Sequence, residues 1–244
     1  MIGTYLNAAG IVAGTLAGLA SRKSLSNTAQ FFSKTVLGVL TIFFGLRLVW
    51  ASLISANGSW LQILKQLGVV LLSLSLGKLA GKLLQLQKSS NHLGHFARDR
   101  MAAMKPGDVR GFTTGFKVCT ALFCAAPIGM LGAIHDGLSG YFAPLAVKAV
   151  MDGLAAMSFV SIFGWGVLFS AVPVLVFQGT ISLACARFLL PVLEAHDLTG
   201  SVNATGGMLI FCVALVIFEI RKIQVTDYLP SLAIAPLLTW WWLR

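Results

Sequence analysis

The chain has 244 residues, of which 57% are hydrophobic and only 11% are charged, and its mean hydropathy is +0.85. Soluble domains carry about 25% charged residues, so this composition excludes an ordinary soluble enzyme, a disordered chain and a fibrous repeat. It predicts an all-α protein with a single integral membrane domain over residues 1–244. The net charge of +10 is better explained by basic loops on one side of a membrane than by nucleic-acid binding.

Eight apolar runs approach the roughly 20 residues that an α-helix needs to cross a bilayer core. They cover about 2–20, 35–55, 60–84, 112–134, 143–163, 166–190, 203–220 and 227–243. We therefore expect a polytopic bundle of about eight transmembrane helices. The last run is short and contains Pro230 and Pro236, so it can tilt, break or span only in part.

Lysine and arginine are concentrated in the connections after the first, third and seventh runs, which lie on one side of the membrane if there are eight spans. The positive-inside rule puts that side in the cytoplasm and both termini outside. Segment 87–110 is then a cytoplasmic loop, which can hold a short amphipathic helix lying on the membrane surface. Its His92 and His95 have no carboxylate partner, so we interpret them as solvated and expect no metal site.

Two parts of the chain resemble each other: GTLAGLASR from Gly14 and GTISLACAR from Gly179. Each is followed by a glycine-containing run and then by a third apolar run, so the first three runs resemble the sixth to eighth. The two triplets would cross the membrane in opposite directions, and such inverted repeats are typical of secondary transporters. The alternative is that Gly-Thr-Leu-Ala sequences simply recur in membrane helices.

Glycines four residues apart share one helix face and allow two helix backbones to approach closely. This spacing fits packing within one chain or a homodimer seam, and we favour the first. The glycines concerned are Gly10, Gly14 and Gly18, then Gly77 and Gly81, and finally Gly111 and Gly115.

Ionisable residues inside apolar runs are the best functional candidates, because a charge in lipid costs about 2.5–3.5 kcal/mol on insertion scales. Lys148 and Asp152 are four residues apart and share a helix face. Asp152 lies roughly 13 Å into its run, near the middle of the membrane. We interpret the two residues either as a structural ion pair or as a proton- or ion-binding site.

The fourth run contains Pro127, Gly129 and Gly132 within six positions. They predict a kink or a broken helix, whose freed backbone groups can bind an ion. Asp136 follows this run and can cap the helix junction. The remaining candidate binding residues are amide side chains in or beside apolar runs, each also typical of interhelical hydrogen bonding: Asn7, Gln178 and Asn203.

Several segments of the chain resemble one known family. They are GTYLNAAGIVAGTLAGL, FCAAPIGMLGAIHDGLSG, KAVMDGLAAM, NATGGMLIF and KIQVTDYLPSLAIAPLL, in this order. Together they resemble the YqgA/YdfK-like family of bacterial membrane proteins, a domain of unknown function. The resemblance implies a polytopic inner-membrane protein, with a link to biofilm formation in one branch of the family. The pair Ala125–Ala126 departs from the glycine-containing pair expected at that place.

The sequence favours a transporter or channel for a small solute or ion, with its site between the fourth, fifth and sixth runs. Catalytic and nucleotide-binding motifs are absent from the sequence, so we expect no enzyme activity and no cofactor. The expected partners are the lipid bilayer, the solute and a second copy of the chain, not nucleic acid. The alternative is a non-transporting scaffold that recruits a partner through 87–110 and affects cell-surface or biofilm behaviour.

Overall fold

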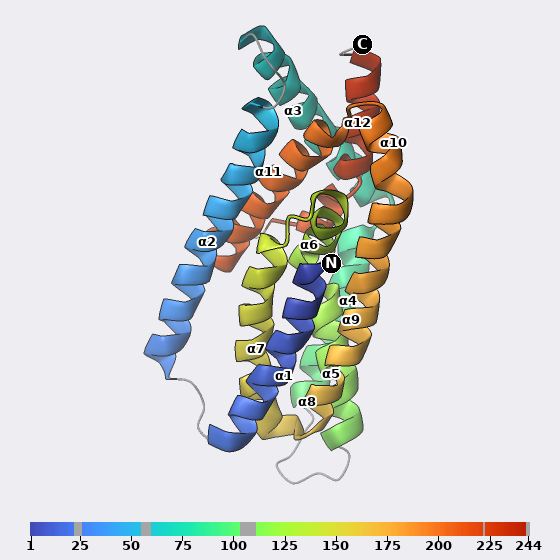
Figure 1. Cartoon of the computed structure of the whole chain (residues 1–244). Helices are drawn as coiled ribbons and strands as arrows, with labels where there is room; N and C mark the ends of the chain where they lie inside the picture. Colours follow the sequence, from blue (N-terminus) through green and yellow to red (C-terminus); the bar gives the residue numbers. More distant parts are fainter. Residues whose placement is uncertain (22–25, 55–59, 103–110, 222, 243–244) are drawn as a thin grey trace.

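The computed structural model describes residues 1–21, 26–54, 60–102, 111–221 and 223–242, and within these ranges it contains helices and no strands (Figure 1). The α-helices are α1 (Ile2–Ser21), α2 (Asn27–Ile54), α3 (Trp60–Leu83), α4 (Leu86–Ala102), α5 (Gly111–Ala125), α6 (Pro127–Ser139), α7 (Ala143–Phe163), α8 (Gly166–Phe169), α9 (Ala171–Ala184), α10 (Leu190–Ala195), α11 (Thr199–Ile217) and α12 (Ser231–Trp242). A π-helical turn, η1 (Cys185–Leu189), joins α9 to α10, and a 3-10 turn, η2 (Val225–Tyr228), precedes α12.

Six of the described helical segments are long and apolar enough to cross a bilayer: α1, α2, α3, α7, the continuous segment Gly166–Ala195, and α11. The bent pair α5–α6 raises the number of candidate spans to seven. The predicted all-helical membrane fold is therefore confirmed. The predicted eighth span is not confirmed, because the described part of 227–243 contains only the end of η2 and the 12 residues of α12. Pro230, which has no backbone N–H to continue a helix, separates the two.

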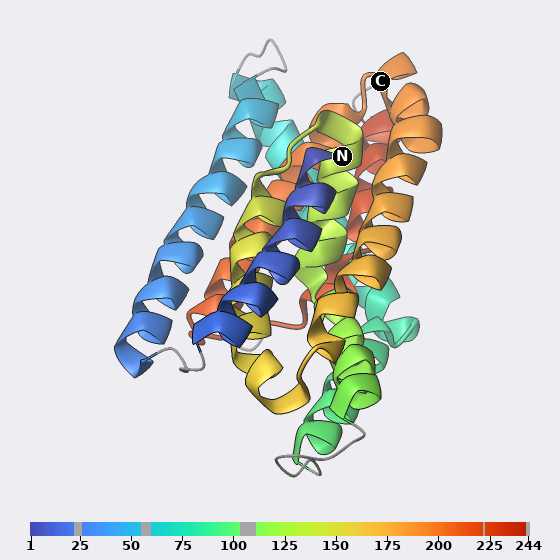
Figure 2. The same cartoon turned by 60° about the horizontal axis from the view of Figure 1, so that its bottom comes forward.

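The spanning segments alternate in direction and pack in close pairs (Figures 1 and 2). α1 lies along α7, α2 along α11, and α3 along α12. Glycines lie at these crossings: a Cβ added to Gly14 would lie 2.0 Å from the carbonyl oxygen of Gly153, and one added to Gly77 would lie 2.6 Å from the backbone nitrogen of Ser231. The glycine steps of α1 and α3 thus serve packing within the chain, as we favoured from the sequence.

Buried apolar side chains form two clusters, and the bent span connects them. Val118 and Phe123 of α5 belong to a cluster with α1, α7, α8 and α9. Ile128 and Leu131 of α6 belong to the other, with α10, α11, η2 and α12. The break between α5 and α6 therefore lies between the two halves of the core.

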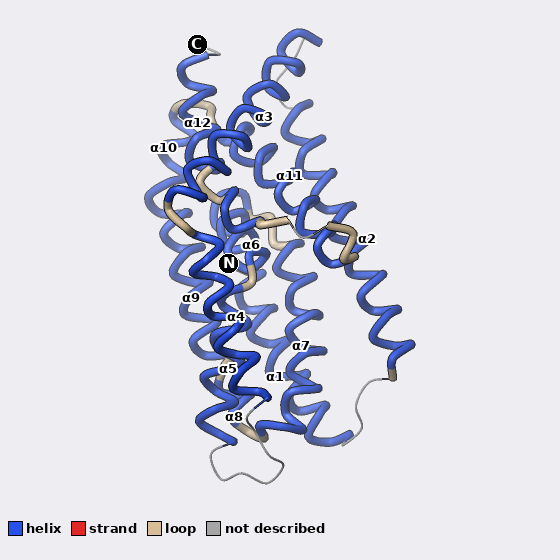
Figure 3. Tube along the Cα trace, turned by 180° about the vertical axis from the view of Figure 1, so that it is seen from behind, coloured by secondary structure: helices blue, strands red, loops and turns tan. Residues whose placement is uncertain are grey.

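Segment 87–110 was expected to hold a short helix, and α4 forms one that packs against a spanning helix. It runs antiparallel along α5, beside which it lies in Figures 1 and 3. Ala97 is fully buried with residues of α5, and the Ser90 hydroxyl donates to the carbonyl oxygen of Ala125 at 3.3 Å. The Gln87 backbone N–H donates to Asp227 at 2.8 Å, which ties α4 to η2. Small side chains on one face allow this polar helix to pack against a span; 103–110 lie outside the described residues.

An exposed ion pair joins the beginning of α2 to the end of α11. Lys34 donates a hydrogen bond to Glu219, whose side chain is 79% exposed. This hydrogen bond and the positive charge of Lys34 hold the pKa of Glu219 below its usual value. A lowered carboxyl pKa means that the stabilisation is present at neutral pH and is lost as the pH falls through that lowered value.

Glu219→Gln is therefore expected to lower the melting temperature slightly at pH 7 and not at all at strongly acidic pH. The effect is small because the pair is exposed to solvent. Melting curves of both proteins between pH 3 and pH 8 measure it. A difference between the two proteins that grows as the pH falls would contradict this assignment.

Candidate functional site

The site is centred on Lys148 and Asp152, which lie one turn apart on α7 and form the buried pair. The Lys148 ammonium donates a hydrogen bond to the Asp152 carboxylate. The Lys148 side chain is 1% exposed and that of Asp152 is 11% exposed. The predicted shared helix face is confirmed. Both residues are therefore buried, Lys148 more completely than Asp152.

Two amides from distant parts of the chain complete this cluster. Asn7 of α1 donates through Nδ2 to Oε1 of Gln178 of α9 at 3.1 Å, and both side chains are fully buried. The Asn7 Oδ1 and the Gln178 Nε2 have no hydrogen-bond partner among the described residues. The cluster thus contains one acceptor and one donor that are not used by the protein.

The broken span brings the start of α6 to the same place. Ala126 is extended, with φ −64° and ψ 122°, Pro127 begins α6, and the two helices are bent by 61°. The predicted break at Pro127 is confirmed. A Cβ added to Gly129 would lie 2.8 Å from Cε of Lys148 and 3.1 Å from Nε2 of Gln178. Only glycine at this position lets both side chains reach the first turn of α6.

The last turn of α5 supplies an aromatic neighbour to the cluster. The Nζ atom of Lys148 lies 5.9 Å from the centroid of the Phe123 ring, a distance at which the ring face attracts a cation. Five helices, α1, α5, α6, α7 and α9, therefore contribute to the surroundings of the buried pair. The fourth, fifth and sixth runs correspond to four of these helices, and α1 contributes Asn7, which was also a candidate from the sequence.

Asp136 lies inside α6, whereas the sequence placed it just past the fourth run. It caps the start of α1 and not the junction after its own helix. It is 3% exposed and lies 3.2 Å from the amino group of Met1. Its carboxylate also accepts from the backbone N–H of Thr4 at 3.3 Å. A carboxylate at the start of α1 satisfies free N–H groups there and favours the helix dipole. The partners of Asp136 are thus at the start of α1 and not in the buried pair.

Two other candidates lie elsewhere. A Cβ added to Gly132 would lie 2.7 Å from the Leu145 side chain, so Gly132 serves the close packing of α6 on α7. Asn203 of α11 contacts His135 of α6, with 3.2 Å between Oδ1 and Nδ1. Neither residue is brought to the buried pair.

His135 was not among the candidates from the sequence, although it is fully buried. Its Nε2 atom has no hydrogen-bond partner among the described residues. The ring packs against Gly206: a Cβ added to this glycine would lie 1.8 Å from Nε2 of His135. The sequence did contain a signal for His135, because two adjacent ionisable residues, His135 and Asp136, follow an apolar run.

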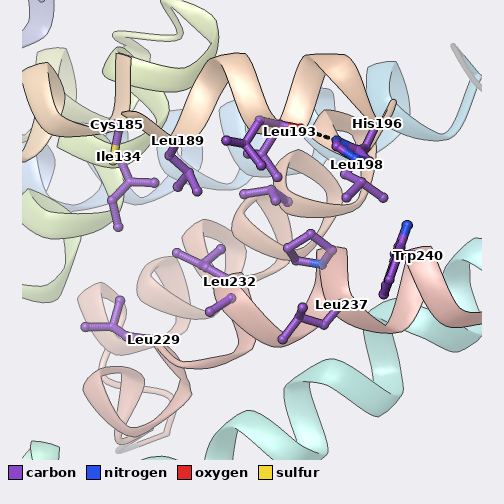
Figure 4. A pocket seen from close by; sticks show the side chains of 14 residues that line it. Ile134, Cys185, Leu189, Leu193, His196, Leu198, Leu229, Leu232, Leu237 and Trp240 are labelled. Carbon is purple, nitrogen blue, oxygen red and sulfur yellow. Dashed lines mark hydrogen bonds between the residues drawn. The ribbon is translucent and has the colours of Figure 1, made fainter. Parts of the chain in front are cut away.

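Two cavities are found elsewhere in the described bundle. The larger, of about 610 Å³, is an apolar cleft between α6, η1, α10, α11 and α12. Figure 4 shows Leu193 and Leu232 on its walls, with His196 and Trp240 at one end. The smaller, of about 230 Å³, lies between α2, α7 and α11 and includes Lys34 in its lining. Neither is lined by the buried pair, whose surroundings are closely packed.

Metal binding finds no support in the parts of the chain that the structure describes, where no group of three histidine, cysteine, aspartate or glutamate residues is suitably placed. His92 and His95 are exposed on α4. The four cysteines, which include Cys119 and Cys124 of α5, are free thiols.

A polytopic α-helical membrane protein with charged and amide side chains buried among its spans is the class that these features define. The chain belongs to the family described as "Protein of unknown function (DUF554)", which matches residues 2–240. It is similar to the "Uncharacterized membrane protein YdfK" of Bacillus subtilis (strain 168), with 26% identity over 97% of this chain and 94% of that protein. It is also similar to the "Uncharacterized protein YqgA" of Escherichia coli (strain K12), with 28% identity over 99% and 97% of the two chains. No solved structure matches this chain.

Proposed function

We propose that this protein is an inner-membrane transporter or channel for a small solute or ion, and that the buried pair forms its site. The observation that carries the proposal is the meeting of a Lys–Asp pair, two amides and a broken span at one buried point. Ionisable groups within membrane spans are costly and are typical of ion and proton pathways. Broken helices occur at membrane depth where they surround a binding site or pack on protein.

An inverted repeat would support this function, and the packing of the helices agrees with one. Helices that the repeat makes equivalent lie against each other: α1 against α9, α2 against α11, and α3 against α12. The contact of α2 with α11 is also reciprocal. A Cβ on Gly45 would lie 2.9 Å from the oxygen of Gly207, and a Cβ on Gly207 would lie 2.7 Å from that of Gly45. A two-fold axis in the membrane plane relates neighbouring elements in this way.

The proposed orientation places the basic connections, including α4, in the cytoplasm and both termini in the periplasm, which requires α12 to cross the membrane after the seven candidate spans. It rests on the distribution of lysine and arginine along the chain. This orientation can be tested in intact cells by introducing cysteines into α4 and near the C-terminus and labelling them with a thiol reagent.

Asp152→Asn is expected to abolish flux through the reconstituted protein. The substitution keeps the shape of the side chain but removes the charge that pairs with Lys148. Flux is measured with a pH-sensitive dye inside proteoliposomes under imposed gradients of sodium, potassium, chloride, nitrate or formate. Asp99→Asn on the exposed face of α4 is the matched control and keeps wild-type flux. Equal flux in Asp152→Asn and wild type would remove Asp152 from the mechanism.

A scaffold that recruits a partner is the second candidate, and the outer face of α4 favours it. Lys88, Arg98 and Arg100 are exposed there while the opposite face packs on α5. Deletion of the segment would break the contacts of α4 with α5 and η2, so reversal of these three charges is the better test. Loss of a co-purifying partner with unchanged flux would favour the scaffold.

A further inference from the structure

The net charge of the buried pair restricts what the site can bind. Lys148 and Asp152 carry one charge each, of opposite sign, and Asn7 and Gln178 are neutral. A net charge away from water costs several kcal/mol per ion, whereas a balanced set costs much less. Every ligand that enters must therefore keep the sum of charges near zero. An ion cannot enter alone; it must enter with a counter-charge or replace one.

The donors around the pair favour a negative ligand. Gln178 Nε2, fully buried and without a partner, lies 3.1 Å from the place where a Cβ of Gly129 would be, and therefore beside the first turn of α6. Helix α6 has 13 residues, and its N-terminal end carries partial positive charge. The Lys148 ammonium adds a full positive charge at the same place. Among the described residues, the carboxylate that pairs with the Lys148 ammonium is that of Asp152, and Gln178 Nε2 has no hydrogen-bond partner.

We propose that the site binds one small monovalent anion together with one proton. The proton binds to the Asp152 carboxylate, which then releases Lys148. The anion takes the place of the carboxylate as the partner of the Lys148 ammonium and also accepts a hydrogen bond from the unpartnered Gln178 Nε2. One positive and one negative charge enter, so the sum is unchanged. The side chains pack closely around Gly129, which favours a small anion such as a halide, nitrate or formate. This inference rests on the proposed function and names its substrate class.

The pH dependence belongs to Asp152 because other charged groups face elsewhere. From α5, the thiols of Cys119 and Cys124 interact electrostatically with the pair. On α6, His135 faces Asn203 and Asp136 faces the start of α1. Helices α1 and α9 present amides, and Lys34 of α2 lies on another face of α7, beside Met151 and Ser158. The thiols are neutral at acidic pH, so Asp152 is the group that titrates.

The test measures anion binding to the purified full-length protein in lipid nanodiscs. Melting curves followed by the fluorescence of the six tryptophans are recorded with sodium chloride, nitrate or formate against sodium gluconate at equal ionic strength, between pH 5 and pH 8. At least one of the small anions is expected to raise the melting temperature. Its affinity is expected to increase about tenfold for each unit by which the pH falls, since one proton binds with each anion.

Variants separate the two parts of the proposal. Asp152→Asn is neutral at every pH, so it is expected to bind the same anion with an affinity that does not depend on pH. Lys148→Met is expected to lose anion binding, and Lys34→Met, on an exposed side chain, keeps wild-type behaviour. The melting curve in gluconate reports whether each variant is folded. If Lys148→Met is not folded, the result for Asp152→Asn decides the test by itself.

A wild-type protein that melts cooperatively but responds to none of the three anions would overturn the inference. So would an Asp152→Asn variant with the same pH dependence as the wild type. Flux of another solute in the proteoliposome assay would then leave the proposed function intact. Anion binding without any flux would instead overturn the transport proposal and leave the binding site.

Discussion

Lys148→Met is expected to lower the free energy of unfolding by about 3–5 kcal/mol, because it leaves the buried Asp152 carboxylate without its counter-charge. Replacing both residues, as Lys148→Met with Asp152→Leu, is expected to recover most of this loss. The reason is that the cost of a broken buried pair comes mainly from the charge left behind, and apolar side chains of similar volume leave none. Unfolding by denaturant in detergent micelles, followed by tryptophan fluorescence, measures all three proteins.

The matched control for this cycle is the exposed pair Lys34 and Glu219. Lys34→Met is expected to change stability far less, since solvent and salt screen an exposed charge. A double variant of the buried pair as unstable as Lys148→Met would show that packing, not charge, determines the loss. A double variant that is stable but inactive in the flux assay would assign the pair to function.

Gly14→Ala is expected to destabilise the protein by about 1–3 kcal/mol, the usual cost of overpacking a closely packed core. The added carbon would lie 2.0 Å from the Gly153 oxygen and 2.5 Å from its carbonyl carbon, so α1 and α7 must separate. A backbone carbonyl cannot rotate away as the end of a long side chain can. Because α1 and α7 carry Asn7 and the buried pair, we also expect a loss of flux in proteoliposomes. The melting temperature of the purified variant measures the effect on stability.

Gly68→Ala is the matched control, because no atom lies within 4 Å of a Cβ added there. Alanine favours a helix by about 1 kcal/mol over glycine, so this variant is expected to be as stable as the wild type or more stable. Similar melting temperatures for the two alanine variants would mean that α1 and α7 are not in close contact.

Local features of this site could be predicted from the sequence, and long-range ones could not. The shared face of Lys148 and Asp152 follows from helix geometry, and the break at Pro127 follows from its missing backbone donor. The contact of Asn7 with Gln178 joins residues 171 positions apart, so no spacing rule predicts it. Asp136 was misjudged for the same reason, since its partners are at the start of α1.

The helices show the same division. Apolar runs of spanning length predicted the all-helical fold, because their length and composition are local properties. The count of about eight spans included the last run, for which Pro230 and Pro236 predicted a tilt, a break or a partial span; the structure divides this run into η2 and α12. The packing of α4 on α5 was missed because its polar composition predicts a surface, whereas a narrow face of small residues is enough for contact.

The opposite charges of Lys148 and Asp152 also determine how the site responds to membrane voltage. A single charge moved across the bilayer gains or loses about 2.3 kcal/mol for each 100 mV. The two charges are one helical turn apart on the same rigid helix, so any motion of α7 moves them together and the electrical work on one cancels that on the other. If a conformational change carries this pair through the membrane as a unit, the membrane voltage does no net work on the pair.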